Sequence, residues 1–251
     1  MNISKIVKSI TANNKRPRDV FHSDHYLRHN QRRQEHLATL GLELANRSVL
    51  ELGAGIGDHT SFFLDRRCRV VVSDARPTNV EHLRQRFKMC SDTDVRRIDI
   101  DQSQVIGLGD SELFDVVYCY GLLYHIGRPA EALRYMAAHC MGILLLELCV
   151  SFGAQEALNI VPEAQRNPSQ AWTGSGCRPT RSWVFARLRE NFEHVYITLT
   201  QPWHEEFPID WSEAGAAAWP PNRLSRAIFV ASREALTVSS LTTVMTLYQT
   251  R

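Results

Sequence analysis

The sequence lacks the marks of several protein classes. Its 251 residues include only 13 glycines and 10 prolines, with no internal repeat, which excludes a fibrous or disordered chain. No apolar stretch is long enough for a membrane span or a signal peptide. The first 18 residues are basic and free of acidic side chains, as in an organelle transit segment, but a solvated helix is the favoured interpretation. The 29 basic and 27 acidic residues nearly cancel, which argues against a surface for long nucleic acids.

Paired cysteines are also missing. The six cysteines are scattered without a CxxC pair, and several fall in expected strands, where they act as small apolar residues. We therefore expect a reduced, cytoplasmic protein, with neither a membrane nor a nucleic acid as its partner. A chain of this length can bury a full core in one decorated domain.

Apolar runs and helical patterns alternate along the chain. The expected strands are 48–52, 69–73, 94–98, 114–119, 142–150, 194–200 and 227–232, and the expected helices are 22–40, 57–66, 78–88, 129–139 and 181–191. Strands separated by helices predict a doubly wound α/β fold with a mainly parallel sheet and right-handed crossovers. Two long segments without regular alternation, near 151–180 and 201–226, are typical of functional loops.

Three glycines mark the end of the first strand. Residues 50–57 read Leu-Glu-Leu-Gly-Ala-Gly-Ile-Gly, so Gly53, Gly55 and Gly57 stand where the strand turns into a helix. Backbone without side chains can approach a ligand closely, and ligands bind at the carboxyl ends of such strands. Asp74 follows Gly53 by 21 residues, at the end of the second strand, where a carboxylate can accept hydrogen bonds from a ribose. The pattern predicts a cofactor that contains a nucleoside.

The residue before the glycines narrows the choice of cofactor. A dinucleotide fingerprint is G-x-G-x-x-G, whereas this spacing is G-x-G-x-G and Glu51 precedes it in the strand. A carboxylate there repels a pyrophosphate and attracts an ammonium. The segment resembles the first motif of the class I methyltransferases, E/D-x-G-x-G-x-G. Four segments match in order over residues 46–150, and the match extends more loosely over residues 194–232.

The resemblance implies a Rossmann-like methyltransferase fold, with seven strands and an antiparallel last strand, and S-adenosyl-L-methionine as the cofactor. Glu51 and the 53–57 turn would hold the methionine end. Asp74 would hold the ribose, and either Asp99 or Asp101 the adenine amine. The full set of expected cofactor residues is Glu51, Gly53, Ala54, Gly55, Gly57, Asp74, Ala75, Asp99, Ile100, Asp101, Cys119 and Tyr120.

The acceptor is constrained by two absences. No Asp/Asn-Pro-Pro-Tyr follows the fourth strand and no proline precedes Cys119, which disfavours methylation of nucleic-acid bases. We expect transfer to an oxygen or nitrogen of a small molecule or a sugar. The segments 172–181 and 201–208 mix aromatic and charged residues, and the second resembles bacterial methyltransferases of glycan and secondary-metabolite genes. The candidate acceptor contacts are Tyr26, Trp172, Arg178, Arg181 and Trp203.

Few catalytic groups are needed, because a sulfonium already activates the methyl group. His125, His204 and Glu205 are the candidates for removing a proton from the acceptor, although His125 has packing as its alternative role. Four histidines, at 22, 25, 29 and 36, share one face of the helix 22–40. No cysteine or acidic cluster of ligand spacing accompanies them, so no metal is expected.

The sequence predicts one main domain between two shorter terminal segments. Residues 1–45 are expected to form a helical segment over the cofactor cleft, residues 46–235 the methyltransferase domain, and residues 236–251 a tail. The oligomeric state is left open. A catalytically silent protein that binds S-adenosylmethionine, or a methyltransferase acting on proteins, would show the same motif. A nicotinamide-dependent oxidoreductase is disfavoured by the glycine spacing.

Overall fold

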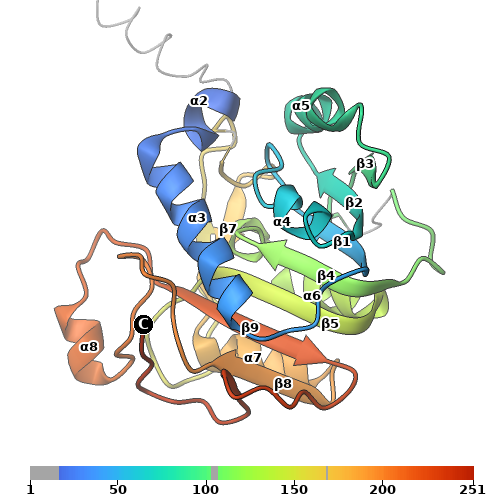
Figure 1. Cartoon of the computed structure of the whole chain (residues 1–251). Coiled ribbons are helices and arrows are strands. Elements are labelled where there is room, and N and C mark those ends of the chain that lie inside the picture. Colours follow the sequence, from blue (N-terminus) through green and yellow to red (C-terminus); the bar gives the residue numbers. More distant parts are fainter. Residues whose placement is uncertain (1–16, 103–106, 168) are drawn as a thin grey trace, which may run out of the picture.

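The computed structural model describes residues 17–102, 107–167 and 169–251 (Figure 1). Most of the basic segment expected as a solvated helix, residues 1–16, lies outside the described residues. Within these ranges no helix combines the length and the apolar character that crossing a membrane requires.

One sheet of eight strands organises the molecule. Its order is β10-β8-β9-β5-β4-β1-β2-β3. The bounds are β1 Ser48–Leu52, β2 Arg69–Asp74, β3 Thr93–Arg97, β4 Phe114–Tyr120, β5 Cys140–Cys149, β8 His194–Thr198, β9 Arg226–Ser232 and β10 Leu241–Thr242. The strands from β3 to β5 pair in parallel, whereas β9 is antiparallel to both β5 and β8. The expected mainly parallel sheet with an antiparallel strand is confirmed.

The two-residue strand β10 was not expected from the sequence. It pairs antiparallel with β8, so the sheet continues beyond residue 235 into the segment that we expected to be a tail. A second small sheet, of β6 Ile160–Pro162 and β7 Ser175–Cys177, occupies the long loop after β5. Short elements such as these have too few residues to show a periodic pattern.

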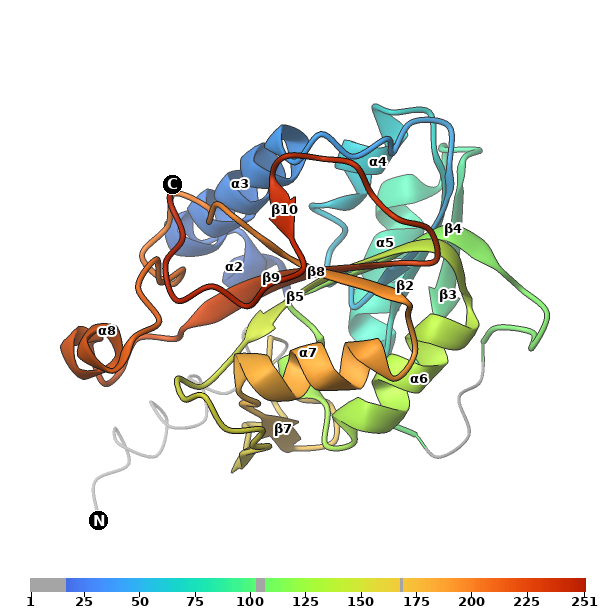
Figure 2. The ribbon, with the colours of Figure 1, turned by 90° about the horizontal axis from the view of Figure 1, so that it is seen from below.

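Helices cover both faces of the large sheet. They are α2 Pro17–Phe21, α3 Asp24–Thr39, α4 Thr60–Leu64, α5 Pro77–Phe87, α6 Pro129–Ala138, α7 Arg181–Arg189 and α8 Glu213–Ala218, with a 3-10 turn η1 at Leu123–His125. Figure 2 shows α3, α4 and α5 on one face and α6 and α7 on the other. This is the doubly wound arrangement, in which apolar strands are shielded from water on both sides.

The core divides into two layers at the central strand β5. Leu144, Leu145, Leu146 and Leu148 are all buried, as expected for a parallel strand covered on both faces. Leu145 belongs to the cluster packed under α3, α4 and α5, whereas Leu144 and Leu146 belong to the cluster packed under α6 and α7. The alternation of side chains along the strand therefore supplies both layers.

Helix α3 packs on the sheet with an unusual face. Ser23 caps its start by accepting a hydrogen bond from the Tyr26 N–H. Its buried residues are His29, Asn30, Arg33, His36 and Leu37, so four of the five are polar. Buried polar groups need partners: His36 is hydrogen-bonded to Thr200, whereas His29, Asn30 and Arg33 face a cavity at the carboxyl ends of the central strands.

Candidate cofactor and acceptor site

The turn after β1 can be built only from glycine. Gly53, Gly55 and Gly57 have φ values of 70°, 59° and 81°, in the left-handed region that other residues avoid. A Cβ added to Gly53 would lie 2.8 Å from the Leu122 Cβ, and one added to Gly57 would lie 2.6 Å from the Phe87 Cε2. The three glycines thus satisfy both the backbone conformation and the close packing around it.

A cavity opens at the carboxyl ends of β1, β2 and β4. Seven of the expected cofactor residues line it: Gly53, Gly55, Asp74, Ala75, Asp99, Ile100 and Asp101. Trp172 and Thr173 of the loop before β7, together with Tyr26 of α3, line the same cavity. The ends of consecutive strands and one long loop therefore meet here, as the sequence predicted for a site in an open α/β sheet.

A second cavity adjoins the first on the other side of the glycine turn. Gly53, Gly55, Gly121 and Tyr26 line both of them. Glu51, Ala54 and Tyr120 line the second cavity, opposite residues of α3 such as His29 and Arg33. Gly57 and Cys119 line neither cavity, because Gly57 packs against α5 and Cys119 lies in the core layer under α6 and α7.

Asp74 ties the end of β2 to the glycine turn. Its Oδ2 accepts a hydrogen bond of 3.0 Å from the Gly55 N–H, and its Oδ1 accepts one of 2.8 Å from the Arg76 N–H. Burial raises the pKa of this carboxyl above its ordinary value, and these hydrogen bonds oppose the shift. The carboxylate thus holds the cavity wall together while it faces the cavity.

Asp99 and Asp101 both reach the first cavity but differ in their partners. Asp101 accepts from the N–H groups of Gly127 and Arg128, each at 3.0 Å, and from the Thr173 hydroxyl at 2.7 Å. Asp99 accepts from the Asp101 N–H at 3.1 Å and from the Gln102 side-chain amide at 3.0 Å. The carboxylate of Asp101 is therefore engaged by more protein donors than that of Asp99.

Glu51 is buried at the end of β1, with 2% of its surface exposed. The Thr60 hydroxyl donates a hydrogen bond of 2.6 Å to its Oε2. Burial raises the pKa of the Glu51 carboxyl to about 7, although the hydrogen bond from Thr60 favours the ionised form. Near neutral pH this group is therefore poised between carrying a proton and binding a cation.

The comparisons with known proteins agree with this geometry. Residues 50–141 match a family model described as a methyltransferase domain, which begins at the strand before the glycine turn and ends in β5. The segment that carries the glycine turn and much of the first cavity wall is therefore similar to methyltransferase domains. No curated protein matches the chain at a significant level.

Several solved structures share the fold of this chain. The N-terminal domain of EvdMO1, solved in the presence of S-adenosylhomocysteine and D-fucose, has 19% identity and a TM-score of 0.58, and the match covers 84% of each chain. The Burkholderia thailandensis 1,6-didemethyltoxoflavin-N1-methyltransferase has 19% identity and a TM-score of 0.52, with 91% of this chain and 85% of that one covered. The glycopeptide N-methyltransferase MtfA has 15% identity and a TM-score of 0.51, with 81% and 86% covered.

The second cavity is walled by a buried network of charges. Arg226 donates to Glu147 Oε1 at 3.0 Å, and Arg33 donates to Glu147 Oε2 at 2.8 Å. Arg226 also donates to Glu206 at 2.6 Å and to the Tyr124 hydroxyl at 3.1 Å. Burial alone would raise the pKa of Glu147, but the two guanidinium groups bring it below its ordinary value. Glu147 was not predicted from the sequence, where its one signal is a charge inside an apolar strand.

His125 lines the first cavity with its imidazole held by a carboxylate. Its Nδ1 is hydrogen-bonded to Glu163 of the loop before β7, and burial lowers the pKa of His125 in spite of that partner. Glu163 also accepts from the Ala171 N–H at 2.7 Å and from Arg178 at 3.1 Å. A neutral imidazole that donates from Nδ1 keeps Nε2 as a proton acceptor.

The remaining predicted residues do not line the two cavities. Arg178 pairs with Glu163 and lies over the Tyr124 ring at 5.0 Å, which puts it one layer behind His125. Arg181 begins α7, where it donates to the Thr246 carbonyl and lies over the Trp211 ring at 4.4 Å. Trp203 is 71% exposed, and the neighbouring His204 and Glu205 contact residues of α3. Of the predicted acceptor contacts, the structure brings Tyr26 and Trp172 to the cavity.

Proposed function

We propose that the protein transfers the methyl group of S-adenosylmethionine to an oxygen or nitrogen of a small molecule or a sugar. The observation that carries this proposal is the pair of adjoining cavities that meet at the Gly53–Gly55 turn. Residues of α3 line both cavities, and the 169–173 segment also lines the first, which suits an acceptor of small size better than a folded protein. The neighbours solved with D-fucose and with 1,6-didemethyltoxoflavin carry ligands of that size.

In the proposed pose the two ends of the cofactor occupy different cavities. In the first cavity Asp74 accepts hydrogen bonds from the ribose, flanked by Ala75, and Asp99 beside Ile100 accepts one from the adenine amine. Asp99 is preferred to Asp101 because fewer protein donors engage it. In the second cavity Glu51 binds the ammonium of the methionine end, which lies along the glycine turn beside Tyr120.

The bound cofactor supplies an electrophilic methyl group on its sulfonium. The protein then has to align the acceptor and exclude water. Tyr26 and Trp172 lie in the walls of the first cavity, where their rings can cover an acceptor. Tyr26 lines both cavities, and this position supports its role at the point where methyl donor and acceptor meet.

We assign proton removal to His125. Its neutral imidazole faces the cavity, and Glu163 fixes the tautomer by accepting the Nδ1–H. An acceptor hydroxyl would give its proton to Nε2 as the methyl group is transferred. His204 and Glu205 do not line either cavity, so they take no proton in this scheme.

The first experiment measures cofactor binding and then turnover. Calorimetry of the purified protein with S-adenosylmethionine, and separately with NAD, should show binding of S-adenosylmethionine alone. Transfer of labelled methyl should then be followed in small-molecule and protein fractions of a cell extract. Label in the small-molecule fraction supports the proposal. Label confined to proteins would identify a protein methyltransferase, and binding without any transfer would identify a catalytically silent protein.

We further propose that the protein works in a reducing compartment such as the cytoplasm. All six cysteines are free, and five of them are buried. Burial raises the pKa of the Cys119 thiol to about 12 and that of the Cys149 thiol to about 12, so neither is a reactive thiolate at neutral pH.

A further inference from the structure

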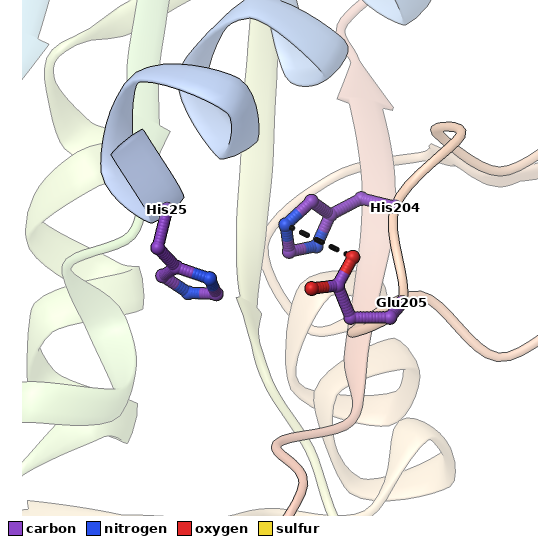
Figure 3. A group of neighbouring side chains, drawn as sticks. All are labelled: His25, His204 and Glu205. Atoms are coloured by element: carbon purple, nitrogen blue, oxygen red, sulfur yellow. Dashed lines mark ion pairs between the residues drawn. The ribbon is translucent and has the colours of Figure 1, made fainter. Parts of the chain in front are cut away.

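Histidines of α3 meet the segment after β8 at one place on the molecule. His25 and His29 lie one turn apart on α3, and His204, Glu205 and Glu206 face them from the other segment. Figure 3 shows His25 on the helix and His204 and Glu205 on the opposing chain, with their side chains directed toward one another. Ligand atoms of His29, His204 and Glu206 all lie within 4.8 Å of one another, as do those of His25, His204 and Glu205.

The contacts within this cluster are longer than hydrogen bonds ordinarily are. His29 Nε2 lies 3.8 Å from Glu206 Oε2, and His25 Nε2 lies 3.4 Å from Glu206 Oε1. His204 Nε2 lies 3.5 Å from Glu205 Oε2. The side chains therefore converge without satisfying one another.

Two of the imidazoles are buried with a nitrogen atom that lacks a partner. His29 and His204 are 4% and 3% exposed. Among the described residues neither His29 Nε2 nor His204 Nε2 has a hydrogen bond. Buried polar atoms are nearly always satisfied, so two such nitrogens aimed at one point call for a ligand between them.

We propose that His29, His204 and Glu206, with His25 as the fourth ligand, bind one divalent transition-metal ion, and that Zn²⁺ is the best match. Neutral imidazole and carboxylate are zinc ligands, and His25 and His29 have the i, i+4 spacing that places two imidazoles on one side of a helix. Ligand atoms around tetrahedral zinc lie about 3.4 Å apart, given bonds of about 2.0–2.1 Å. The ligand atoms of His29, His204 and Glu206, which lie within 4.8 Å of one another, need to approach by at most about 1.4 Å to reach that spacing.

The neighbours of the cluster are compatible with a bound cation. Glu206 keeps its Oε2 on Arg226 at 2.6 Å, and its Oε1 is on the side of His25. The Glu206 N–H donates to His204 Nδ1 at 3.3 Å, and this long hydrogen bond would be lost when the proton of His204 moves to Nδ1 and Nε2 binds the metal. Arg28 forms its ion pair with Glu205 at 2.5 Å, which leaves Glu206 available as a metal ligand.

The position of the cluster indicates a structural metal, which we call the clamp, rather than a metal that takes part in the reaction. Of the four ligands His29 alone lines a cavity, and the other three lie behind it. A metal there would fasten α3 to the segment that carries His204 and Glu206. Because α3 carries Tyr26 and Arg33 in the cavity walls, the clamp would hold these walls in place. This differs from the absence of a metal that we expected, because the acidic ligands come from a distant segment of the chain.

The test is zinc binding by the full chain, purified without an affinity tag and stripped with a chelator. Calorimetry with ZnCl₂ should show one equivalent bound, and MgCl₂ should show none. Zinc should also raise the melting temperature of the stripped protein. The variant His204→Asn should bind zinc at least tenfold more weakly and lose the thermal shift. His22→Asn is the matched control, because His22 is exposed just before α3 and outside the cluster.

A second variant keeps the test decisive if His204→Asn does not fold. His25→Gln alters a side chain that is 52% exposed, so it should fold normally and still weaken zinc binding. Tetrahedral Co²⁺ absorbs strongly in the visible, and the stripped protein loaded with CoCl₂ should show that absorption whereas both variants should not. The proposal is overturned if the stripped protein binds no zinc, or if both variants bind it as well as the unaltered chain.

Discussion

The Gly55 N–H donates a hydrogen bond of 3.0 Å to Asp74, which joins the glycine turn after β1 to the end of β2. The same carboxylate receives the Arg76 N–H at 2.8 Å. Asp74 therefore shapes the turn, and in the proposed pose it also holds the ribose. The two roles can be separated by substitution.

Replacing Asp74 with asparagine leaves one oxygen acceptor for the turn but removes the charge that binds the ribose. We expect Asp74→Asn to weaken binding of S-adenosylmethionine by about 1.5–3 kcal/mol, as for a hydrogen bond to a charged group. Asp74→Ala should weaken it further and also lower the melting temperature, because the Gly55 and Arg76 N–H groups lose their acceptor. Calorimetry and thermal unfolding measure the two effects. Full affinity in a less stable Asp74→Asn variant would make the residue purely structural.

Gly55→Val introduces a branched side chain at φ 59°, where a Cβ would lie 3.2 Å from the Phe21 ring. The conformation alone costs about 1–3 kcal/mol for a residue other than glycine. Affinity for S-adenosylmethionine should fall below detection, because the turn shifts at the junction of the two cavities. Gly109→Ala is the control, since a Cβ there meets Glu112 only at 3.7 Å and the backbone of Gly109 is not in the left-handed region. A folded Gly55→Val protein with unchanged affinity would rule out the proposed cofactor position.

Glu51 predicts a pH dependence near neutrality. Its pKa of about 7 lies above the ordinary value, so the free protein carries a proton there below pH 7 and a charge above it. Affinity for S-adenosylmethionine should therefore rise as the pH increases through about 7, when the carboxylate can pair with the ammonium. Glu51→Gln should bind weakly with little pH dependence in this range. Calorimetry in buffers from pH 5.5 to 8.5 would show this, and an identical pH profile in both proteins would contradict it.

Glu51 also makes the stability of the ligand-free protein depend on pH, with the opposite sign to its effect on cofactor affinity. Because the folded state holds the Glu51 proton more tightly than the unfolded state, its contribution to stability is present at low pH and falls as the pH rises toward 7. Urea unfolding without ligand should show a stability that declines over this interval. The decline should be smaller in Glu51→Gln. An equal decline in the variant would assign the pH dependence to other groups.

His125 and Glu163 are tested by kinetics once an acceptor is known. His125→Ala should lower kcat by about 10²–10⁴ if the imidazole removes the proton, while affinity for S-adenosylmethionine stays close to that of the unaltered protein. Glu163→Gln should lower kcat less and shift the pH profile, because the amide cannot stabilise an imidazolium. Arg166→Ala, at an exposed position of the same loop that lines neither cavity, serves as a control for disturbance of that loop. An unchanged kcat in His125→Ala would leave the residue a packing role.

Glu147 tests the buried charge network. Glu147→Gln removes the charge that neutralises Arg33 and Arg226, both of which are buried. We expect a loss of about 3–5 kcal/mol in the free energy of unfolding, typical when one partner of a buried ion pair is removed. Urea denaturation measures it. Glu112→Gln, at a half-exposed pair with Arg96, is the matched control and should change stability by less than about 1 kcal/mol.

The central part of the fold could be predicted because its signals are local. The apolar run around Leu145 indicates a strand covered on both faces, and the glycines after β1 indicate a tight turn. Each signal is contained within a few residues. The charged partners could not be predicted in this way. Arg33, Glu147 and Arg226 come from three distant segments, and nothing in their own surroundings tells that they meet. The aromatic and charged 203–205 segment was expected at the acceptor site for its composition, but its place beside α3 depends on how β8 and β9 set the path of the loop between them.

The position of β9 has a consequence for how the chain is made. β9 lies between β5 and β8, and β8 has only β9 and β10 as neighbours in the sheet. During synthesis, β1 to β5 can associate while the edge of β5 stays open until residues 226–232 arrive. β8 leaves the ribosome before β9 and β10 have been synthesised, so it stays unpaired until they follow. Completion of the sheet is therefore a late, long-range event, and the open β5 edge is the surface that a nascent chain has to keep from aggregating.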